Sequence, residues 1–347
     1  MGESFLRENR GILNIISHTD LDGVTAAAVA WYAGAFTGVP IKVSLTGYGE
    51  VDNLVLEAWR KSERIVMLDL SVQYQNTVDE IDRTFSGDEP FLFDHHESTS
   101  EKYANRPWIE ADMNYCAAAV YWNWLMKRDD REVKAHIEAM RDMVGIANDR
   151  DLWINENPDG RLWQALVTLC GEWGAFSRLI TNPSASFTPG EREQAVAFVT
   201  AQEERFSRAK EHLTVNRIRG RGDGGEMAFL GDGYLEFGDT SDFCGSILDR
   251  PEEGSRPAAV VLAYRKPSGS WAVSIRSRSG LAGRAVSLLK DGRRVKGGGH
   301  KDAAALYFPS SYDESSIRES ILAALAANSE SSSGAGVTLG DLLKGAL

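Results

Sequence analysis

The stretch "ILNIISHTDLDGVTAAAVAWYAGAF" (residues 12–36) decides the fold class of this chain. Residues 12–17 form a short apolar run that is typical of a buried strand, and the Ala-rich residues 24–36 are typical of a helix. The polar residues 18–23 therefore leave a strand and enter a helix, where Gly23 permits a tight turn. A strand followed directly by a helix is half of a βαβ unit, the repeating element of parallel sheets.

The same alternation continues through the first half of the chain, where hydrophobic spacing predicts three further strands and two intervening helices. Strands that alternate with helices favour a mostly parallel sheet flanked by helices, which is an α/β fold. A longer helical region is expected at residues 116–148. The predicted strands are residues 41–45, 64–70 and 90–94, and the intervening helices are residues 51–61 and 76–85.

The second half of the chain has a different pattern. Pro189 can open a long polar helix that runs to about His212, because proline is favoured at the first helical position. Apolar β-type runs follow it, and they predict a smaller α+β domain. We expect an α/β domain at 1–185, a helical linker at 186–215, the α+β domain at 216–326 and a mostly disordered Ser/Gly-rich tail at 327–347.

The composition limits the partners of this chain. Its 347 residues include 38 Lys and Arg against 50 Asp and Glu, a net charge of −12. An acidic protein is a poor candidate for binding long duplex DNA, because basic charge supplies most of that affinity. The three scattered cysteines predict no disulfide framework. The apolar runs are too short to span a membrane, so we expect a cytoplasmic protein.

Three of the predicted strands end in histidine and aspartate residues. The carboxyl ends of parallel strands meet at one edge of a sheet, so these side chains are expected to converge there. Carboxylates gathered in this way repel one another unless a cation lies between them. Imidazole and carboxylate ligands suit Mn²⁺ or another divalent metal. The residues are His18, Asp20 and Asp22 after the first strand, Asp69 at the end of the third, and Asp94, His95 and His96 at the end of the fourth.

Each aspartate also has a purely structural interpretation. A single aspartate after a strand is commonly a turn former or a helix N-cap, and Asp22 and Asp69 could each cap the helix that follows. The segment "GIANDRDLW" (145–153) offers Asp149 and Asp151, and the residues alone leave the choice between them open. The arrangement of three strand ends together favours a metal site over separate caps.

A basic segment lies in the second domain. Between residues 276 and 301 there are eight basic side chains and one acidic one, and the segment ends in "GGGHKDAAA" (297–305). Glycines there would let backbone N–H groups approach an anion closely. A flexible hairpin and a solvated basic face are the structural alternatives. The coincidence of glycines, a histidine and positive charge favours an anion-binding site.

Taken in order, these motifs resemble the DHH phosphoesterase family, over residues 12–308. "HTDLDG" (18–23), the strand end at Asp69, "DHH" (94–96) and "GIANDRD" (145–151) are similar to its four metal motifs. "GGGHKDAAA" is similar to the signature of the C-terminal substrate-binding domain found in this family. Any one of these motifs would be weak alone, and their order makes the resemblance specific.

The resemblance implies two divalent metal ions, with Mn as the leading candidate and Mg or Co as alternatives. By analogy with the family's fourth motif, Asp149 is chosen over Asp151. Asp94 would orient a neighbouring histidine, and His96 would face the scissile phosphate. The implied ligands are His18 and Asp20 for one ion, Asp22, His95 and Asp149 for the other, and Asp69 between them. The implied substrate-binding residues are Arg276, Gly297, Gly298, Gly299 and His300.

The function that we expect is the hydrolysis of short oligoribonucleotides to mononucleotides by a metal-dependent phosphodiesterase of the nanoRNase type. The alternative is a phosphatase or phosphodiesterase for small nucleotides: 3′-phosphoadenosine 5′-phosphate, cyclic dinucleotides or cyclic mononucleotides. A RecJ-like single-strand exonuclease would need an extended basic channel with stacking aromatics. "GGGH" argues against an inorganic pyrophosphatase, and a nucleotide sensor without turnover ranks low because every matching ligand is present. We expect a short RNA or small nucleotide as partner, no membrane, and an oligomeric state compatible with a homodimer.

Overall fold

The chain folds into two compact units, residues 1–199 and 200–347. The division falls inside the long helix α9 (Pro189–Glu211), within the stretch expected to link two domains. None of the helices in the described ranges combines the length and the apolar character that a membrane span requires. The tail expected at 327–347 lies, apart from its first residue, outside the described residues. The computed structural model describes residues 11–103, 105–218, 225–248, 257–278, 280–299 and 301–327.

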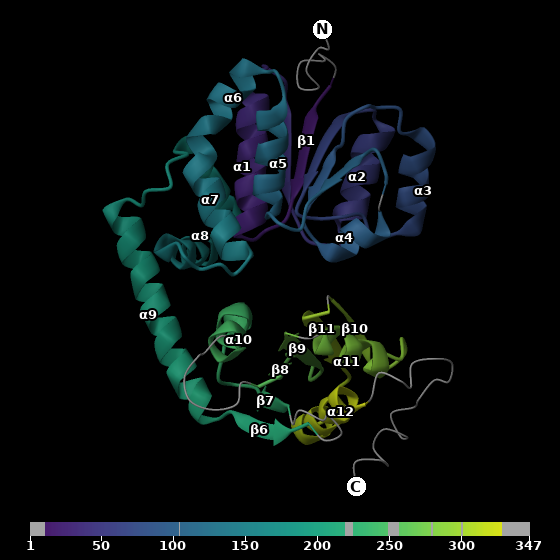
Figure 1. The fold of residues 1–347 in the computed structure, drawn as a ribbon, viewed down its shortest axis with the longest axis vertical. Helices are drawn as coiled ribbons and strands as arrows, with labels where there is room; N and C mark the ends of the chain where they lie inside the picture. The colour runs from purple at the N-terminus through teal and green to yellow at the C-terminus, as the bar shows by residue number, and fades with distance from the viewer. Residues whose placement is uncertain are drawn as a thin grey trace. The chain divides into compact units, whose positions relative to one another are not determined.

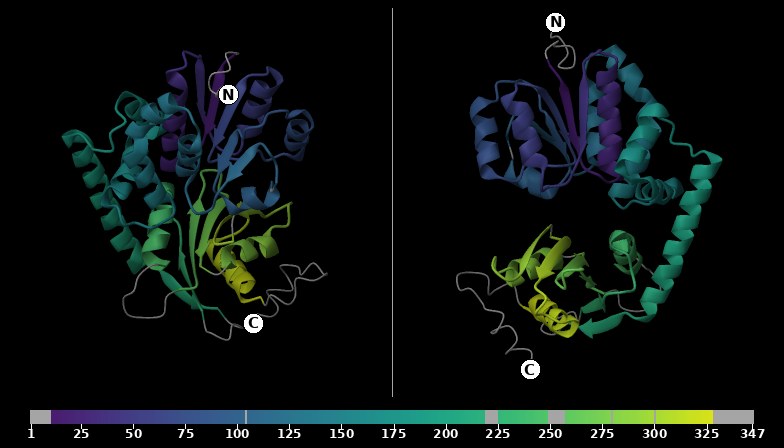
Figure 2. Two further views of the ribbon diagram at one scale, coloured as in Figure 1. Left: turned by 45° about the horizontal axis from the view of Figure 1, so that its top comes forward. Right: turned by 180° about the vertical axis from the view of Figure 1, so that it is seen from behind.

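The first unit contains a five-stranded sheet in the order β2-β1-β3-β4-β5, in which every neighbouring pair is parallel. Helices α1, α5, α6 and α7 lie on one side of this sheet and α2 and α3 on the other (Figure 1), and the right-hand view of Figure 2 shows the same layers from behind. The α/β architecture is therefore confirmed. The strands are β1 (Leu13–Ser17), β2 (Ile41–Leu45), β3 (Arg64–Leu68), β4 (Leu92–Asp94) and β5 (Ile109–Ala111).

Strand β1 is buried along its whole length. Ile15 packs with the helices of one face, and Ile16 belongs to the separate apolar cluster on the other face. A strand covered on both faces needs apolar side chains in both directions, which explains the unbroken run in the sequence. The helices of this unit are α1 (Leu21–Ala35), α2 (Val51–Arg60), α3 (Gln75–Thr84), α4 (Glu97–Lys102), α5 (Ala117–Lys127), α6 (Arg131–Ile137), α7 (Arg141–Asp151) and α8 (Pro158–Thr181).

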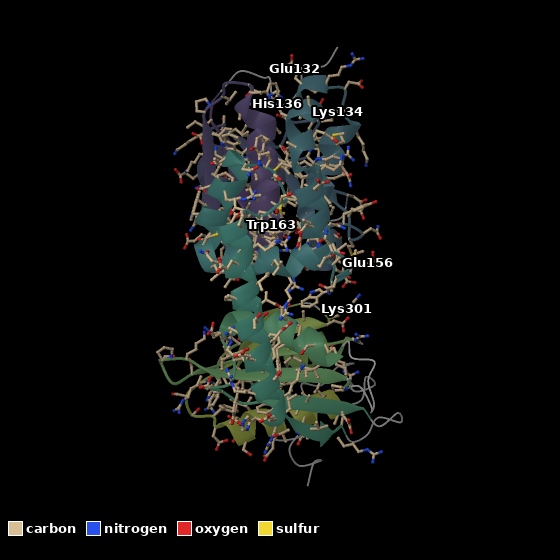
Figure 3. All side chains as sticks on the ribbon, turned by 90° about the vertical axis from the view of Figure 1, so that its left-hand side faces the viewer. Glu132, Lys134, His136, Glu156, Trp163 and Lys301 are labelled. Carbon is tan, nitrogen blue, oxygen red and sulfur yellow. The ribbon has the colours of Figure 1, made fainter. Side chains whose placement is uncertain are left out.

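The helical region expected at 116–148 is interrupted. Asp130 lies between α5 and α6, and its carboxylate accepts hydrogen bonds from the backbone N–H groups of Glu132 and Val133, so it is an N-cap. A short 3₁₀ turn, Glu138–Met140, then separates α6 from α7. Strand β5 was not anticipated, because three residues are too few to show a strand period. In Figure 3, His136 on α6 and Glu156 after α7 lie at opposite ends of this unit.

The second unit contains a six-stranded mixed sheet in the order β10-β11-β9-β8-β7-β6, in which only β7 and β8 are parallel. One apolar cluster joins the sheet to α11 and α12, and another joins its other face to α10 and the end of α9. A smaller α+β unit was expected here. Its elements are β6 (Thr214–Arg217), β7 (Glu226–Leu230), α10 (Thr240–Leu248), β8 (Ala259–Arg265), β9 (Trp271–Ser277), α11 (Leu281–Leu289), β10 (Lys296–Gly299), β11 (Ala303–Phe308) and α12 (Glu314–Ala326).

Candidate metal centre

The turn between β1 and α1 holds two of the predicted ligands together. Asp20 is the N-cap of α1, because its carboxylate accepts a hydrogen bond from the Gly23 N–H at 3.0 Å. A Cβ atom at Gly23 would lie 2.5 Å from the carbonyl oxygen of His18, so only glycine fits this turn. Within it, Nδ1 of His18 lies 2.8 Å from Oδ2 of Asp20. The cap is thus Asp20 and not Asp22.

Asp22 points into the unit from the first turn of α1. Its side chain is buried, and its two oxygens accept hydrogen bonds from the N–H groups of Ala117 and Ala118 at 2.7 and 2.8 Å. These N–H groups open α5, and the positive end of a helix favours a carboxylate. Oδ2 of Asp22 also lies 3.9 Å from Nε2 of His95.

Asp69 follows β3 and faces two histidines from different strands. Its Oδ2 lies 3.6 Å from Nδ1 of His18, and its Oδ1 lies 3.4 Å from Nε2 of His95. The backbone of Asp69 has a φ of +57°, a conformation that costs on the order of 1–3 kcal/mol and that clusters at functional sites. The two oxygens of the Asp69 carboxylate therefore face different histidines, one His18 and the other His95. This is the arrangement expected of a carboxylate shared between two metal ions.

The "DHH" motif ends β4. Oδ1 of the fully buried Asp94 lies 2.7 Å from Nδ1 of His96 and accepts the His95 N–H at 2.8 Å. The contact restricts the orientation of the His96 ring. Nδ1 of His96 lies 3.9 Å from Oδ1 of Asp69.

The structure does not bring Asp149 into this cluster, which corrects the choice of that residue. The carboxylate of Asp149 accepts hydrogen bonds from the N–H groups of Glu156 and Asn157 at 3.0 and 3.1 Å, and so shapes the loop after α7. Asp151 lies in the cluster instead, with Oδ2 3.4 Å from Nε2 of His95. Two helical residues two positions apart differ by about 200° around the helix axis, so only one of them can face the site.

The ligand atoms form three overlapping groups, and within each group they lie within 4.8 Å of one another. The first two groups contain the residues of the two expected ligand sets, with Asp151 in place of Asp149, and their division between two ions stays a prediction. The groups are His18, Asp20 and Asp69; Asp22, His95 and Asp151; and Asp69, Asp94, His95 and His96.

The electrostatics of the cluster favour a bound cation. Burial raises the pKa of Asp22, and the charges of Asp69 and Asp151 raise it further. Burial, with repulsion from Asp69, also raises the pKa of Asp151 to about 6. Among the described residues, the buried Oδ2 of Asp151 has no hydrogen-bond partner. Repelling carboxylates with an unsatisfied oxygen and nearby imidazoles fit divalent metal ions.

The histidines respond to the same charges. Burial opposes protonation of His18 and His95, but their hydrogen bonds to Asp20 and Asp69 outweigh it. The pKa of His18 rises to about 11 and that of His95 to about 10. The carboxylates thus favour positive charge at these rings, and a divalent cation would supply such charge.

One aromatic residue beside the cluster was missed by the sequence analysis. The ring of Tyr48 lies 6.2 Å from the ring of His18 and is partly exposed, at 42%. Tyr48 could have been noticed, because "GYG" (47–49) follows a predicted strand at the same edge of the sheet.

The predicted substrate-binding residues lie in the second unit. The Arg276 guanidinium on β9 contacts the Ser274 and Ser241 hydroxyls, at 3.4 and 3.5 Å. The glycines lie on strand β10, at the edge of the sheet, and not in a loop, and their substrate-binding role stays a prediction. A Cβ atom at Gly297 would lie 2.7 Å from the Ala305 carbonyl oxygen, so close pairing with β11 explains that glycine. Gly298 and Gly299 continue β10, and His300 lies outside the described residues.

No protein-family model and no curated protein matches this sequence. Several solved structures share its fold. Exonuclease RecJ bound to manganese is 14% identical with a TM-score of 0.56, over 95% of this chain and 93% of that one. The DHH domain of a member of the s1p family of ribosomal proteins is 14% identical with a TM-score of 0.55, over 92% and 87%. CDC45 from Entamoeba histolytica is 5% identical with a TM-score of 0.58, over 93% and 97%.

These likenesses show that the chain has the fold of DHH-domain proteins, as its motifs predicted. At sequence identities of 14% or less, these similarities establish only the fold and not the activity. The oligoribonuclease branch and the substrate-binding role of the second unit stay predictions.

Proposed function

We propose that this chain is a phosphoesterase that uses two divalent metal ions to hydrolyse short oligoribonucleotides to mononucleotides. The observation that carries the proposal is the position of Asp69, whose two oxygens face His18 and His95 separately. Manganese is the metal named for the RecJ structure of similar fold, so it is the first metal to test here, with magnesium and cobalt after it.

The residues divide into two ligand sets. His18 and Asp20 would hold one ion and Asp22, His95 and Asp151 the other, with Asp69 shared between them. Two such ions lower the pKa of a water molecule and neutralise charge on the phosphoryl oxygens during in-line attack.

His96 is the candidate general acid. Burial disfavours its charged form, but the hydrogen bond to Asp94 outweighs burial and raises the pKa of His96. A protonated imidazole held in one orientation can give its proton to the oxygen that leaves the phosphate. Such general acid catalysis is typically worth about 10²–10⁴-fold in rate.

The charge of the protein favours small substrates. With a net charge of −12, the chain lacks the overall positive field that retains long nucleic acids. One guanidinium beside two hydroxyls, at Arg276, is suited to a single phosphate group. A substrate of a few nucleotides fits both observations.

The test is a panel of substrates assayed in parallel with Mn²⁺: an RNA dimer, a longer RNA, a cyclic dinucleotide, 3′-phosphoadenosine 5′-phosphate and pyrophosphate. We expect the highest kcat/KM for the RNA dimer. Asp69→Asn, with its fold checked by circular dichroism, should abolish the activity. Activity on pyrophosphate alone, or full activity of Asp69→Asn, would refute the proposal. A higher kcat/KM for a cyclic dinucleotide or 3′-phosphoadenosine 5′-phosphate than for the RNA dimer would instead indicate that small nucleotides are the substrates.

A further inference from the structure

The N-terminus of α5 is held by side chains from two other helices. Helices α1, α5 and α7 pack against one another on one side of the parallel sheet (Figure 1). Cys116 stands at the N-cap of α5, where cysteine is not among the residues that cap a helix well. The first N–H groups of a helix have no partner within the helix, so their acceptors must come from elsewhere. Here they come from α1 and α7.

Three consecutive N–H groups at this end of α5 donate to those side chains. The N–H group of Cys116 donates to Oδ1 of Asn148 on α7, at 2.8 Å. The N–H groups of Ala117 and Ala118 donate to the two carboxylate oxygens of Asp22 on α1, at 2.7 and 2.8 Å. Asn148 and Asp22 therefore bind adjacent N–H groups of one helix end, so the position of α5 against α7 sets where the Asp22 carboxylate is held.

The same hydrogen bond sets the rotation of α7. Asp151 is three residues beyond Asn148 on this helix, and residues three apart lie on one face, about 60° apart around the helix axis. When Asn148 faces the start of α5, Asp151 therefore lies on the adjoining part of that face, and its Oδ2 lies 3.4 Å from Nε2 of His95. Asp149 lies about 100° from Asn148 in the opposite sense, and its carboxylate binds the loop after α7 instead.

Asp22, His95 and Asp151 form one candidate ligand set. We propose that Asn148 is a positioning residue for this set. Its hydrogen bond to the Cys116 N–H group holds α5 and α7 in the arrangement in which the carboxylates of Asp22 and Asp151 reach the same metal ion. This inference rests on the proposed function, because that function assigns an ion to these ligands. The amide carries no charge, so Asn148 acts on the geometry of the ligands and leaves the charge of the site unchanged.

The experiment is a calorimetric titration of the full chain with Mn²⁺, in which the wild-type protein is compared with Asn148→Ala. Alanine is the better helix former, so α7 should persist in this variant, and circular dichroism checks its fold. The affinity for the ion assigned to Asp22, His95 and Asp151 should fall roughly 10–100-fold, the loss typical of residues that hydrogen-bond in support of a metal site. The affinity for the other ion should stay unchanged. Asn148→Asp keeps an acceptor oxygen and should retain most of the affinity.

Asn157→Ala is the matched control. Oδ1 of Asn157 also accepts an N–H group at the start of a helix, that of Asp159 in α8, at 3.0 Å. Loss of this cap should lower the urea midpoint of unfolding. It should leave both Mn²⁺ affinities unchanged, because the start of α8 holds none of the candidate ligands.

The outcomes separate this inference from the proposed function. An unchanged affinity in Asn148→Ala, or an equal loss in both alanine variants, would overturn the inference while the wild-type titration still shows two ions. A loss in Asn148→Asp as large as that in Asn148→Ala would overturn it as well. Two bound ions without cleavage of the RNA dimer would refute the proposed hydrolysis alone. A wild-type chain that binds fewer than two ions would overturn both.

Discussion

Oδ2 of Asp151 lies 3.4 Å from Nε2 of His95, which joins the end of α7 to the end of β4 at the candidate metal centre. We therefore predict that Asp151→Asn removes one ion from the site while the other stays bound. The affinity for the ion assigned to Asp22, His95 and Asp151 should fall by more than roughly 10–100-fold. That range is the loss seen when a residue that only hydrogen-bonds to a metal ligand is replaced. Calorimetric titration with Mn²⁺ measures the number of ions and their affinities.

Asp149→Asn is the control for this substitution. Because the Asp149 carboxylate binds two backbone N–H groups, the change should lower the free energy of unfolding by about 1 kcal/mol. It should keep the number of bound ions. The reverse outcome, in which Asp149→Asn loses an ion and Asp151→Asn does not, would restore the assignment that the motif alone suggested.

The repulsion within the cluster predicts that Mn²⁺ stabilises the protein. Burial and neighbouring carboxylates raise the pKa values of Asp22 and Asp151, so these groups are held together at an energetic cost. A ligand that binds only the folded state stabilises it by about 2.7 kcal/mol at 100 times its Kd. The thermal midpoint should therefore rise with Mn²⁺ concentration. In Asp69→Asn this rise should be much smaller, and an equal rise in both proteins would place the bound ions elsewhere.

The sequence predicted the parts of the site that depend on sheet topology. Any side chain that follows a parallel strand reaches the same edge, so His18, Asp69 and His95 could be grouped without a structure. The choice between Asp149 and Asp151 depended on where α7 ends and on its rotation, which hydrophobic spacing does not fix. Likewise, the glycines at 297–299 are compatible with a paired edge strand as well as with a loop. Local composition does not distinguish the two.

A pH-dependent interaction lies in the second unit, between α9 and the turn before α10. Asp239 accepts hydrogen bonds from Arg205 and Gln202, both at 3.0 Å. Burial alone would raise the pKa of Asp239, but these hydrogen bonds hold it below its ordinary value. A lowered pKa stabilises the folded state above the unfolded pKa, and this contribution is lost as the pH falls through the folded pKa.

Asp239→Asn should therefore lower the free energy of unfolding near pH 7 by about 1–3 kcal/mol. The difference from the wild-type protein should shrink below about pH 4, as the pH falls from the ordinary pKa of aspartate towards the lowered pKa of folded Asp239. Urea titrations at several pH values measure this. Asp232→Asn, at an exposed position in the same unit, should show no such trend. If the difference in the free energy of unfolding stays constant down to pH 3, the charge of Asp239 does not contribute to the stability of the folded state.

Two glycines in the first unit should respond to alanine with opposite signs. At Gly23 a Cβ atom would lie 2.5 Å from the His18 carbonyl oxygen, a backbone atom that cannot move without disturbing the turn. At Gly145, inside α7, it would meet nothing within 4 Å. Gly23→Ala should lower the free energy of unfolding by about 1–3 kcal/mol because of this clash. Gly145→Ala should raise it by about 0.5–1 kcal/mol, because alanine is the better helix former.

Urea unfolding followed by tryptophan fluorescence measures both changes, and Mn²⁺ titration separates stability from ligand geometry. Since the turn at Gly23 places His18 against Asp20, Gly23→Ala should also weaken metal binding, whereas Gly145→Ala should leave it unchanged. A Gly23→Ala protein that is as stable as Gly145→Ala and binds Mn²⁺ equally well would show that the turn tolerates a side chain. The close approach of Gly23 to His18 would then not position the ligand.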